Sequence, residues 1–136
     1  MKPNLVYLIL ISTLFFGCKN DKNLEGNYSI CIDGEYTEVY FKQDSMRIAS
    51  ENEWVNLTEW KKIEINNDTL LFETFGEWRN VSKAKIKHIG MNKTELRILE
   101  SDVTLNLEQM NEKLNFKDSI EFWNGFKIRR NYKKCN

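Results

Sequence analysis

Residues 28–34, Tyr-Ser-Ile-Cys-Ile-Asp-Gly, decide how the fold of this chain is interpreted. The large apolar side chains of Tyr28, Ile30 and Ile32 alternate with smaller or polar side chains. Alternation with a period of two is typical of a half-buried strand. Asp33-Gly34 is a dipeptide that favours a tight hairpin turn. The stretch therefore predicts a strand that ends in a hairpin.

The same succession of a short alternating segment and a turn continues through the rest of the chain. Further strands are predicted within 35–43, 46–48, 54–66, 69–75, 82–89, 94–99 and 103–108, with a closing hairpin of 119–123 and 126–132 around Asn124-Gly125. Residues 109–115 predict one helical turn or a loop, and no long helix is expected. About eight to ten short strands with tight turns indicate an all-β fold. We expect an antiparallel meander barrel because the connections are short, with a β-sandwich as the alternative.

The opening Leu24-x-Gly26-x-Tyr28 resembles the start of the first strand in lipocalin-like barrels, where Gly-x-Trp is usual. In those barrels an arginine from the end of the chain packs over the aromatic ring. The resemblance implies that Arg129 or Arg130, expected in the last strand, would cover Tyr28 in this way. It also implies a bridge between the C-terminal region and the barrel.

The first residues of the chain have the pattern of an export signal. Lys2 precedes an apolar run at 5–16, interrupted only by Ser12 and Thr13. A helix of that length spans about 18 Å, which is too short for the roughly 30 Å core of a bilayer. A positive start, a short apolar core and a small residue before the cleavage point indicate a secretory signal. Gly17-Cys18 resembles the lipobox of bacterial lipoproteins.

The lipobox resemblance implies cleavage before Cys18 and acylation of that cysteine, which would anchor the protein in a membrane. The alternative is an ordinary signal peptide with a chance cysteine. We expect residues 1–17 to be the signal peptide, 18–23 the lipidated cysteine with a polar tether, and 24–136 a single domain. Lys19 follows the cysteine where an aspartate would favour the inner membrane, so the expected location is the cell envelope, at the outer membrane.

Two cysteines remain once Cys18 is assigned to lipid, namely Cys31 and Cys135. Two thiols in an exported protein indicate one disulfide bond. It would close a loop of about 100 residues and join the last strand to the first, for which the chain-entropy relation gives about 4–5 kcal/mol. The alternative is two unpaired cysteines.

Composition and motifs argue against several function classes. The 20 basic and 20 acidic residues balance, so no net field attracts nucleic acid. No phosphate loop, nucleophile elbow or zinc-binding histidine pair is present, and no cofactor is implied. His88, the single histidine, follows Ala84 and Ile86 in phase and is expected to face inward. We therefore expect no catalytic residue and no metal site.

Aromatic residues are the most informative remaining feature. Trp54, Trp60 and Trp78 are candidate binding residues, because tryptophan near loops offers a flat apolar area with a polar handle. The alternative is that the large rings fill the core of a small barrel. The resulting hypothesis is a tethered, non-catalytic binding module for a small apolar ligand, a sugar or an envelope protein. The competing hypothesis is a protein-interaction lipoprotein of the inhibitor or immunity type.

Overall fold

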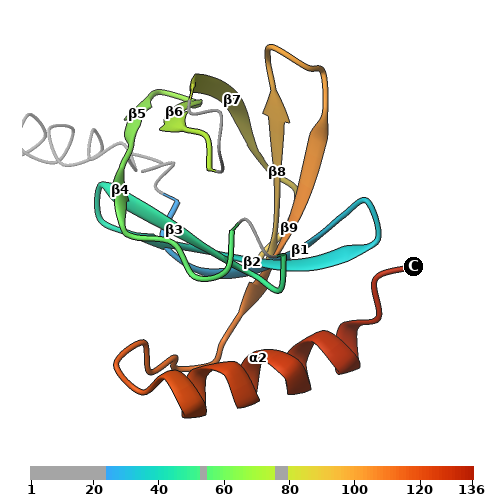
Figure 1. The fold of residues 1–136 in the computed structure, drawn as a ribbon. Coiled ribbons are helices and arrows are strands. Elements are labelled where there is room, and N and C mark those ends of the chain that lie inside the picture. The colour runs from blue at the N-terminus through green and yellow to red at the C-terminus, as the bar shows by residue number, and fades with distance from the viewer. Residues whose placement is uncertain (1–23, 53–54, 76–79) are drawn as a thin grey trace, which may run out of the picture.

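The computed structural model describes residues 24–52, 55–75 and 80–136. The predicted signal peptide, the lipidated Cys18 with its tether, Trp54 and Trp78 lie outside the described residues. The described part forms one sheet and one helix (Figure 1), with the bounds β1 Gly26–Ile32, β2 Glu35–Lys42, β3 Ser45–Ser50, β4 Lys61–Lys62, β5 Glu64–Asn66, β6 Thr69–Glu73, β7 Val81–His88, β8 Lys93–Ile98, β9 Thr104–Met110 and α2 Ser119–Lys133.

The strands form a nearly closed barrel. Their order in the 9-stranded sheet is β4-β3-β2-β1-β9-β8-β7-β6-β5, and the pairs are antiparallel. The two edge strands, β4 and β5, follow one another in the chain with only Ile63 between them. Lys61 Nζ on β4 also binds Glu73 Oε1 on β6 at 3.1 Å. The expected all-β antiparallel meander barrel is therefore confirmed, and the alternative sandwich is not the fold.

The pairing register defines two ends of the barrel. At the N-terminal end β1 begins, and the turns at 43–44, 67–68 and 89–92 lie there. At the opposite end, which we call the mouth, lie the turns at 33–34 and 99–103. Asp33 and Gly34 have φ of 51° and 81°. Both angles are positive, as a two-residue hairpin turn of type I′ requires, so the predicted hairpin is confirmed.

Side chains fill the middle of the barrel. On β7, Ser82, Ala84 and Ile86 are buried while the intervening lysines are exposed, as the pleat of a strand dictates. The core inside the barrel consists of Leu24, Tyr28, Ile30, Val39, Phe41, Met46, Ile63, Leu70, Ala84, Ile86, Leu96 and Leu107. The sheet and this core come from residues 24–110.

The predicted closing hairpin at 119–132 is wrong, because Ser119–Lys133 is an α-helix. Asp118 caps its first turn by accepting a hydrogen bond from the Glu121 backbone N–H at 3.0 Å. Phe122 and Phe126 lie one turn apart and are buried. Figure 1 shows α2 lying outside the barrel, along β1, β2 and β3.

A second apolar cluster joins this helix to the barrel wall. The buried members are Tyr36, Tyr40, Ala49, Phe122 and Phe126. The inner residues of β2 are buried on both faces of the sheet, because one face points into the barrel and the helix covers the other. β2 thus separates two packed layers.

Two expectations about single residues are also corrected. His88 is exposed, and its Nδ1 lies 3.0 Å from Thr94 Oγ1. Arg129 and Arg130 belong to the helix and not to a last strand. Arg129 binds Glu38 on the outer wall, whereas Tyr28 is part of the core inside the barrel and donates a hydrogen bond to the Glu25 carbonyl at 3.1 Å. Arg130 pairs with Glu51, so neither of the two predicted arginines covers Tyr28 in the lipocalin manner.

The predicted disulfide between Cys31 and Cys135 is present, with Cα atoms 5.5 Å apart. Its sequence separation of 104 residues makes it the longest-range covalent link in the described chain. It ties the segment after α2 to β1, where a link between first and last strands was expected. The bridge therefore holds the helix against the barrel wall.

Candidate functional site

The barrel has an open pocket of about 490 Å³ at its mouth. This volume falls within the range of small-molecule sites, about 300–1,000 Å³. Apolar side chains form much of the wall, and they come from both halves of the sheet: Ile32, Ile48, Val55, Phe72 and Phe75. The pocket is therefore a candidate ligand site.

The pocket exists because the inward phase of several strands continues past the packed core. Ile32 follows the buried Ile30 in phase, and Phe72 follows the buried Leu70. Residues at these later positions pack against the core on one side only and remain half-buried. Since no further layer of side chains covers them among the described residues, their apolar surface faces the mouth.

The polar residues that line the mouth pocket are uncharged along β3, and acidic at the β1–β2 turn. Thr37 and Ser50 are buried and face each other across β2 and β3. Ser50 Oγ accepts a hydrogen bond from the Asn52 backbone N–H at 3.1 Å. Asp33 and Glu35 line the pocket at the β1–β2 turn. Such a site offers apolar contact, two hydroxyl groups and an acidic border.

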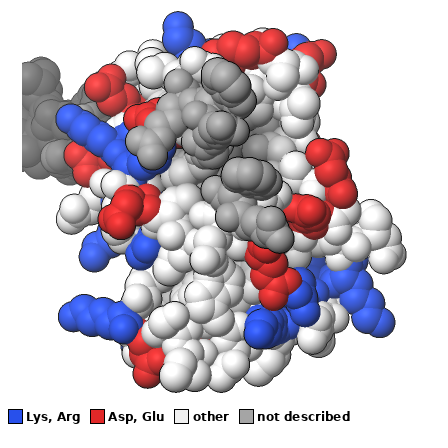
Figure 2. Space-filling model, viewed as in Figure 1, with Lys and Arg blue, Asp and Glu red and all other residues white. Residues whose placement is uncertain are grey.

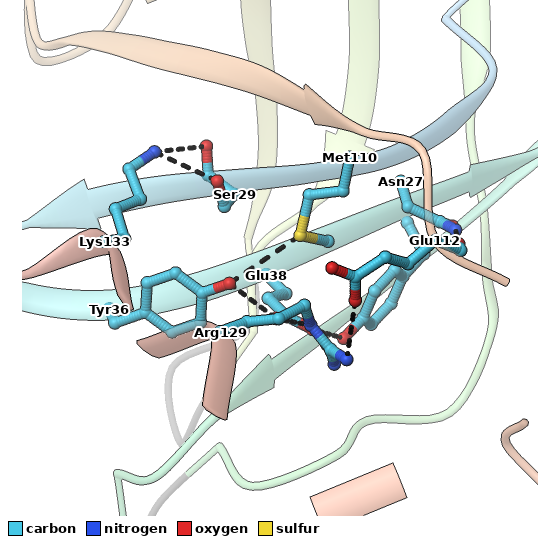
Figure 3. Close-up of polar contacts among 9 residues, drawn as sticks. Asn27, Ser29, Tyr36, Glu38, Met110, Glu112, Arg129 and Lys133 are labelled. Atoms are coloured by element: carbon cyan, nitrogen blue, oxygen red, sulfur yellow. Dashed lines mark hydrogen bonds and ion pairs between the residues drawn. The ribbon is translucent and has the colours of Figure 1, made fainter. Parts of the chain in front are cut away.

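A second polar cluster, the Glu38 cluster, lies between the outer wall and α2. It consists of Tyr36, Glu38 and Arg129, which Figure 3 labels, and of Tyr40. Glu38 is 0% exposed. Its carboxylate accepts hydrogen bonds from Tyr36 Oη at 2.6 Å, from Arg129 Nε at 2.7 Å and Nη2 at 3.0 Å, and from Tyr40 Oη. One carboxylate therefore binds three neighbours, and Arg129 brings the helix to the strand.

The electrostatics of the Glu38 cluster follow from burial and from the carboxylate. Burial raises the pKa of Tyr36 and of Tyr40 well above the ordinary value of 10.0, and the charge and hydrogen bonds of Glu38 raise it further. Burial opposes the charged form of Arg129, but the hydrogen bonds and charge of Glu38 outweigh it and raise the pKa of Arg129. The tyrosines stay neutral and the arginine stays charged.

This cluster is suited to holding the helix in place and not to chemistry. Both carboxylate oxygens of Glu38 already accept hydrogen bonds, and its side chain has no contact with solvent. Proton transfer requires a group within reach of a substrate. Around the cluster, Arg129 also binds Glu112 at 3.2 Å and Lys133 donates to Ser29 Oγ at 2.9 Å (Figure 3). These contacts join α2 to β1 and to the loop after β9.

The sequence interpretation missed the Glu38 cluster. The signal was the outward face of 35–42, where a glutamate stands between two tyrosines. A face with two large rings needs cover, and a charge between them needs an opposite charge once it is covered. The partner could not be found while 126–132 was interpreted as a strand.

Of the predicted binding tryptophans, Trp60 is the one within the described residues, and it does not line the mouth pocket. Trp60 is half-exposed near the N-terminal end, with its ring 5.9 Å from that of Phe116 and the Arg47 guanidinium 5.3 Å from its centroid. Trp54 and Trp78 lie outside the described residues. The apolar residues described at the pocket wall are phenylalanine, isoleucine and valine.

Charges do not form a large one-signed patch on the face seen in Figure 2, where acidic and basic side chains are interspersed. Within 24–52, 55–75 and 80–136, no group of three or more His, Cys, Asp or Glu could hold a metal ion. No helix in these ranges is long and apolar enough to cross a membrane. Comparison with protein-family models, with curated proteins and with solved structures finds no match to this chain.

Proposed function

We propose that this protein is a lipoprotein of the bacterial cell envelope, anchored at the outer membrane through Cys18, whose barrel binds a small apolar ligand at its mouth. The leader with its Gly17-Cys18 pair supports the anchor. The open pocket of about 490 Å³ between Ile32, Ile48 and Phe72 is the observation that carries the binding function.

The chemistry of the pocket favours an apolar ligand over a sugar. Ile32, Ile48, Val55, Phe72 and Phe75 retain apolar surface that a ligand would remove from water, with a gain of about 25 cal/mol per Å². Hydroxyl groups of Thr37 and Ser50 would orient one polar end of such a ligand. Trp60, the exposed tryptophan among the described residues, lies elsewhere, and the rings of Phe72 and Phe75 at the pocket carry no polar group for the hydroxyls of a sugar.

The described chain starts at the end of the barrel opposite the proposed site. Residues 19–23 bridge at most about 20 Å when fully extended, and they lead into Leu24 at the N-terminal end. The mouth would therefore open toward the aqueous side, away from the membrane that holds the lipid. A ligand from the aqueous phase would reach the site without crossing the protein.

The binding proposal is tested with the anchor-free mature chain, residues 19–136, in its oxidised form. The neutral apolar dye N-phenyl-1-naphthylamine is titrated, because an anionic dye would be repelled by Asp33 and Glu35. We expect saturable fluorescence enhancement that Phe72→Ser weakens by about tenfold or more, as the loss of a large apolar contact implies. Ile120→Ser on the exposed face of α2 is the matched control and is expected to bind like the parent chain. Equal affinities for both variants would contradict the site.

The anchor is tested separately. Cys18→Ser should move the full chain from the membrane to the soluble fraction, and mass analysis of the mature N-terminal peptide should show acylated Cys18 in the parent chain. Membrane association of Cys18→Ser would contradict the anchor and would leave the dye experiment unaffected.

A second candidate function has one observation in its favour. Ile120, Ile128 and Tyr132 are exposed along the outer side of α2. An apolar face of this kind is typical of protein contact surfaces and supports the alternative of a protein-interaction lipoprotein. A photo-crosslinking residue at position 128 in living cells should then join this chain to one protein partner, whereas the same residue at position 97 on β8 should not.

A further inference from the structure

The turn between β7 and β8 exposes large apolar side chains to water. Residues 87–93 are all exposed. Ile89 is 52% exposed and Met91 is 95% exposed. The turn is nonetheless well defined, because the Ile89 backbone N–H donates to the Lys93 carbonyl at 2.9 Å. Lys87 and Lys93 flank the apolar pair on either side.

This turn lies beside the point where the chain begins the barrel. The Asn92 carbonyl accepts a hydrogen bond from the Gln109 backbone N–H at 2.8 Å. Gln109 pairs with Tyr28 on β1, and its side chain lies against Gly26. The exposed turn and the residues that follow the tether therefore lie next to each other at the N-terminal end.

We infer that the turn 89–92 lies in the headgroup layer of the membrane that holds the acyl chains of Cys18, an inference that rests on the proposed anchor. The tether of residues 19–23 spans at most about 20 Å, so this end of the barrel stays close to the bilayer. Ile89 and Met91 would leave water there, and Lys87 and Lys93 would extend their ammonium groups to lipid phosphates, as amphipathic side chains do at interfaces.

The membrane fits this turn better than it fits the exposed apolar residues of α2 or those at the mouth end, Leu99 and Val103. On α2 the exposed apolar residues are Ile120, Ile128 and Tyr132. They lie along the side of the molecule (Figure 1) and not beside the start of the described chain. At the N-terminal end, Trp60 adds an exposed aromatic ring near Glu25 and Gly26. Tryptophan is favoured where one side of a ring is apolar and the other is wet. Two apolar features thus lie near the first residues of the described chain.

Hydroxyl-radical footprinting of the full lipoprotein tests the inference. The acylated protein is anchored in vesicles of phosphatidylethanolamine and phosphatidylglycerol, and the anchor-free chain 19–136 in buffer is the reference. Met91 and Tyr132 serve as the two reporters, because they are 95% and 92% exposed. We expect oxidation of Met91 to slow several-fold in the vesicles and that of Tyr132 to stay unchanged.

Variants add a second readout. In the anchored protein with Ile89→Asp and Met91→Asp, we expect His88 to be oxidised faster than in the parent, because two carboxylates oppose insertion. Val103→Asp, at an exposed apolar position of the mouth end, is the matched control and should leave His88 as in the parent. If Met91 is oxidised at the same rate in vesicles and in buffer, or if Tyr132 is slowed instead, the inference is overturned. Acylated Cys18 in the same sample would show that the proposed anchor still holds. A sample without acylated Cys18 would overturn the anchor instead.

Discussion

Replacing Arg129 by methionine is expected to be among the most destabilising single changes in the domain. Arg129 is 12% exposed in its side chain and binds both oxygens of the fully buried Glu38, at 2.7 and 3.0 Å. Methionine fills similar space but leaves the carboxylate between Tyr36 and Tyr40 without a cation. The variant therefore separates the role of the charge from that of the apolar stem.

The expected loss follows from the burial of Glu38. Removing one partner of a buried ion pair costs about 3–5 kcal/mol, because the remaining charge is uncompensated. A domain of this size has a free energy of unfolding of about 5–15 kcal/mol, so the loss is a large share. The additional contact of Arg129 with the exposed Glu112 adds little.

Urea unfolding of the oxidised chain 19–136 at neutral pH, followed by far-UV circular dichroism, measures this loss. Arg97→Met is the matched control, since Arg97 pairs with Asp102 at 2.7 Å with side chains 62% and 78% exposed, and its loss should stay below about 1 kcal/mol. The double variant Glu38→Gln with Arg129→Met should be more stable than Arg129→Met alone, because glutamine keeps hydrogen bonds to the tyrosines without a charge. The reasoning is refuted if Arg129→Met and Arg97→Met lose equal stability, or if the double variant is the least stable of the three.

Three further predictions concern the disulfide, the start of β1 and alkaline pH. Replacing Cys31 and Cys135 together by serine should lower the unfolding free energy by about 4–5 kcal/mol, given a separation of 104 residues; a loss below about 1 kcal/mol in urea would contradict the chain-entropy account. Gly26→Ala should cost about 1–3 kcal/mol, because φ is +105° and the new Cβ would lie 3.3 Å from Gln109 Nε2, whereas Gly90→Ala, with open space around it, should change thermal stability little. The pKa values of Tyr28, Tyr36 and Tyr40 are raised in the folded state, so their contribution to stability is complete below about pH 10, the unfolded value, and is lost as pH rises above it. Melting temperatures across the alkaline range should therefore fall less steeply for Tyr36→Phe with Tyr40→Phe than for the parent chain.

Local pattern was sufficient for most of the sheet. The alternation of Tyr28, Ile30 and Ile32 and the Asp33-Gly34 turn were sufficient to predict β1 and its hairpin, and the structure has both. The meander followed from short connections, which leave neighbouring strands little choice but to pair. Closure of the barrel could not be derived from local pattern, because it depends on the stagger between neighbouring strands summed over all nine strands.

The helix at 119–133 was missed because one dipeptide was given too much weight. Asn124-Gly125 suits a hairpin turn, but Asp118 and Glu121 form a helix start signal three residues apart. Phe122, Phe126 and Arg129 also recur with helical spacing along one face. Gly125 has a packing reason within the helix, since a Cβ there would lie 2.8 Å from Arg129 Nη1. The glycine leaves room for the guanidinium that reaches Glu38, which no local turn rule can reveal.

The mouth pocket was beyond local prediction for a different physical reason. Ile30 and Ile32 carry the same side chain in the same phase, yet the first is buried in the core and the second lines the pocket. The difference depends on how far each strand extends past the last filled layer, which is a property of strand stagger around the barrel. Tryptophans were chosen as binding candidates for their chemistry, whereas position along the barrel axis decides which apolar side chains stay open. Strand alternation therefore predicts only that a side chain points inward. Whether that side chain is in the core or lines a ligand pocket depends on the geometry of the closed barrel.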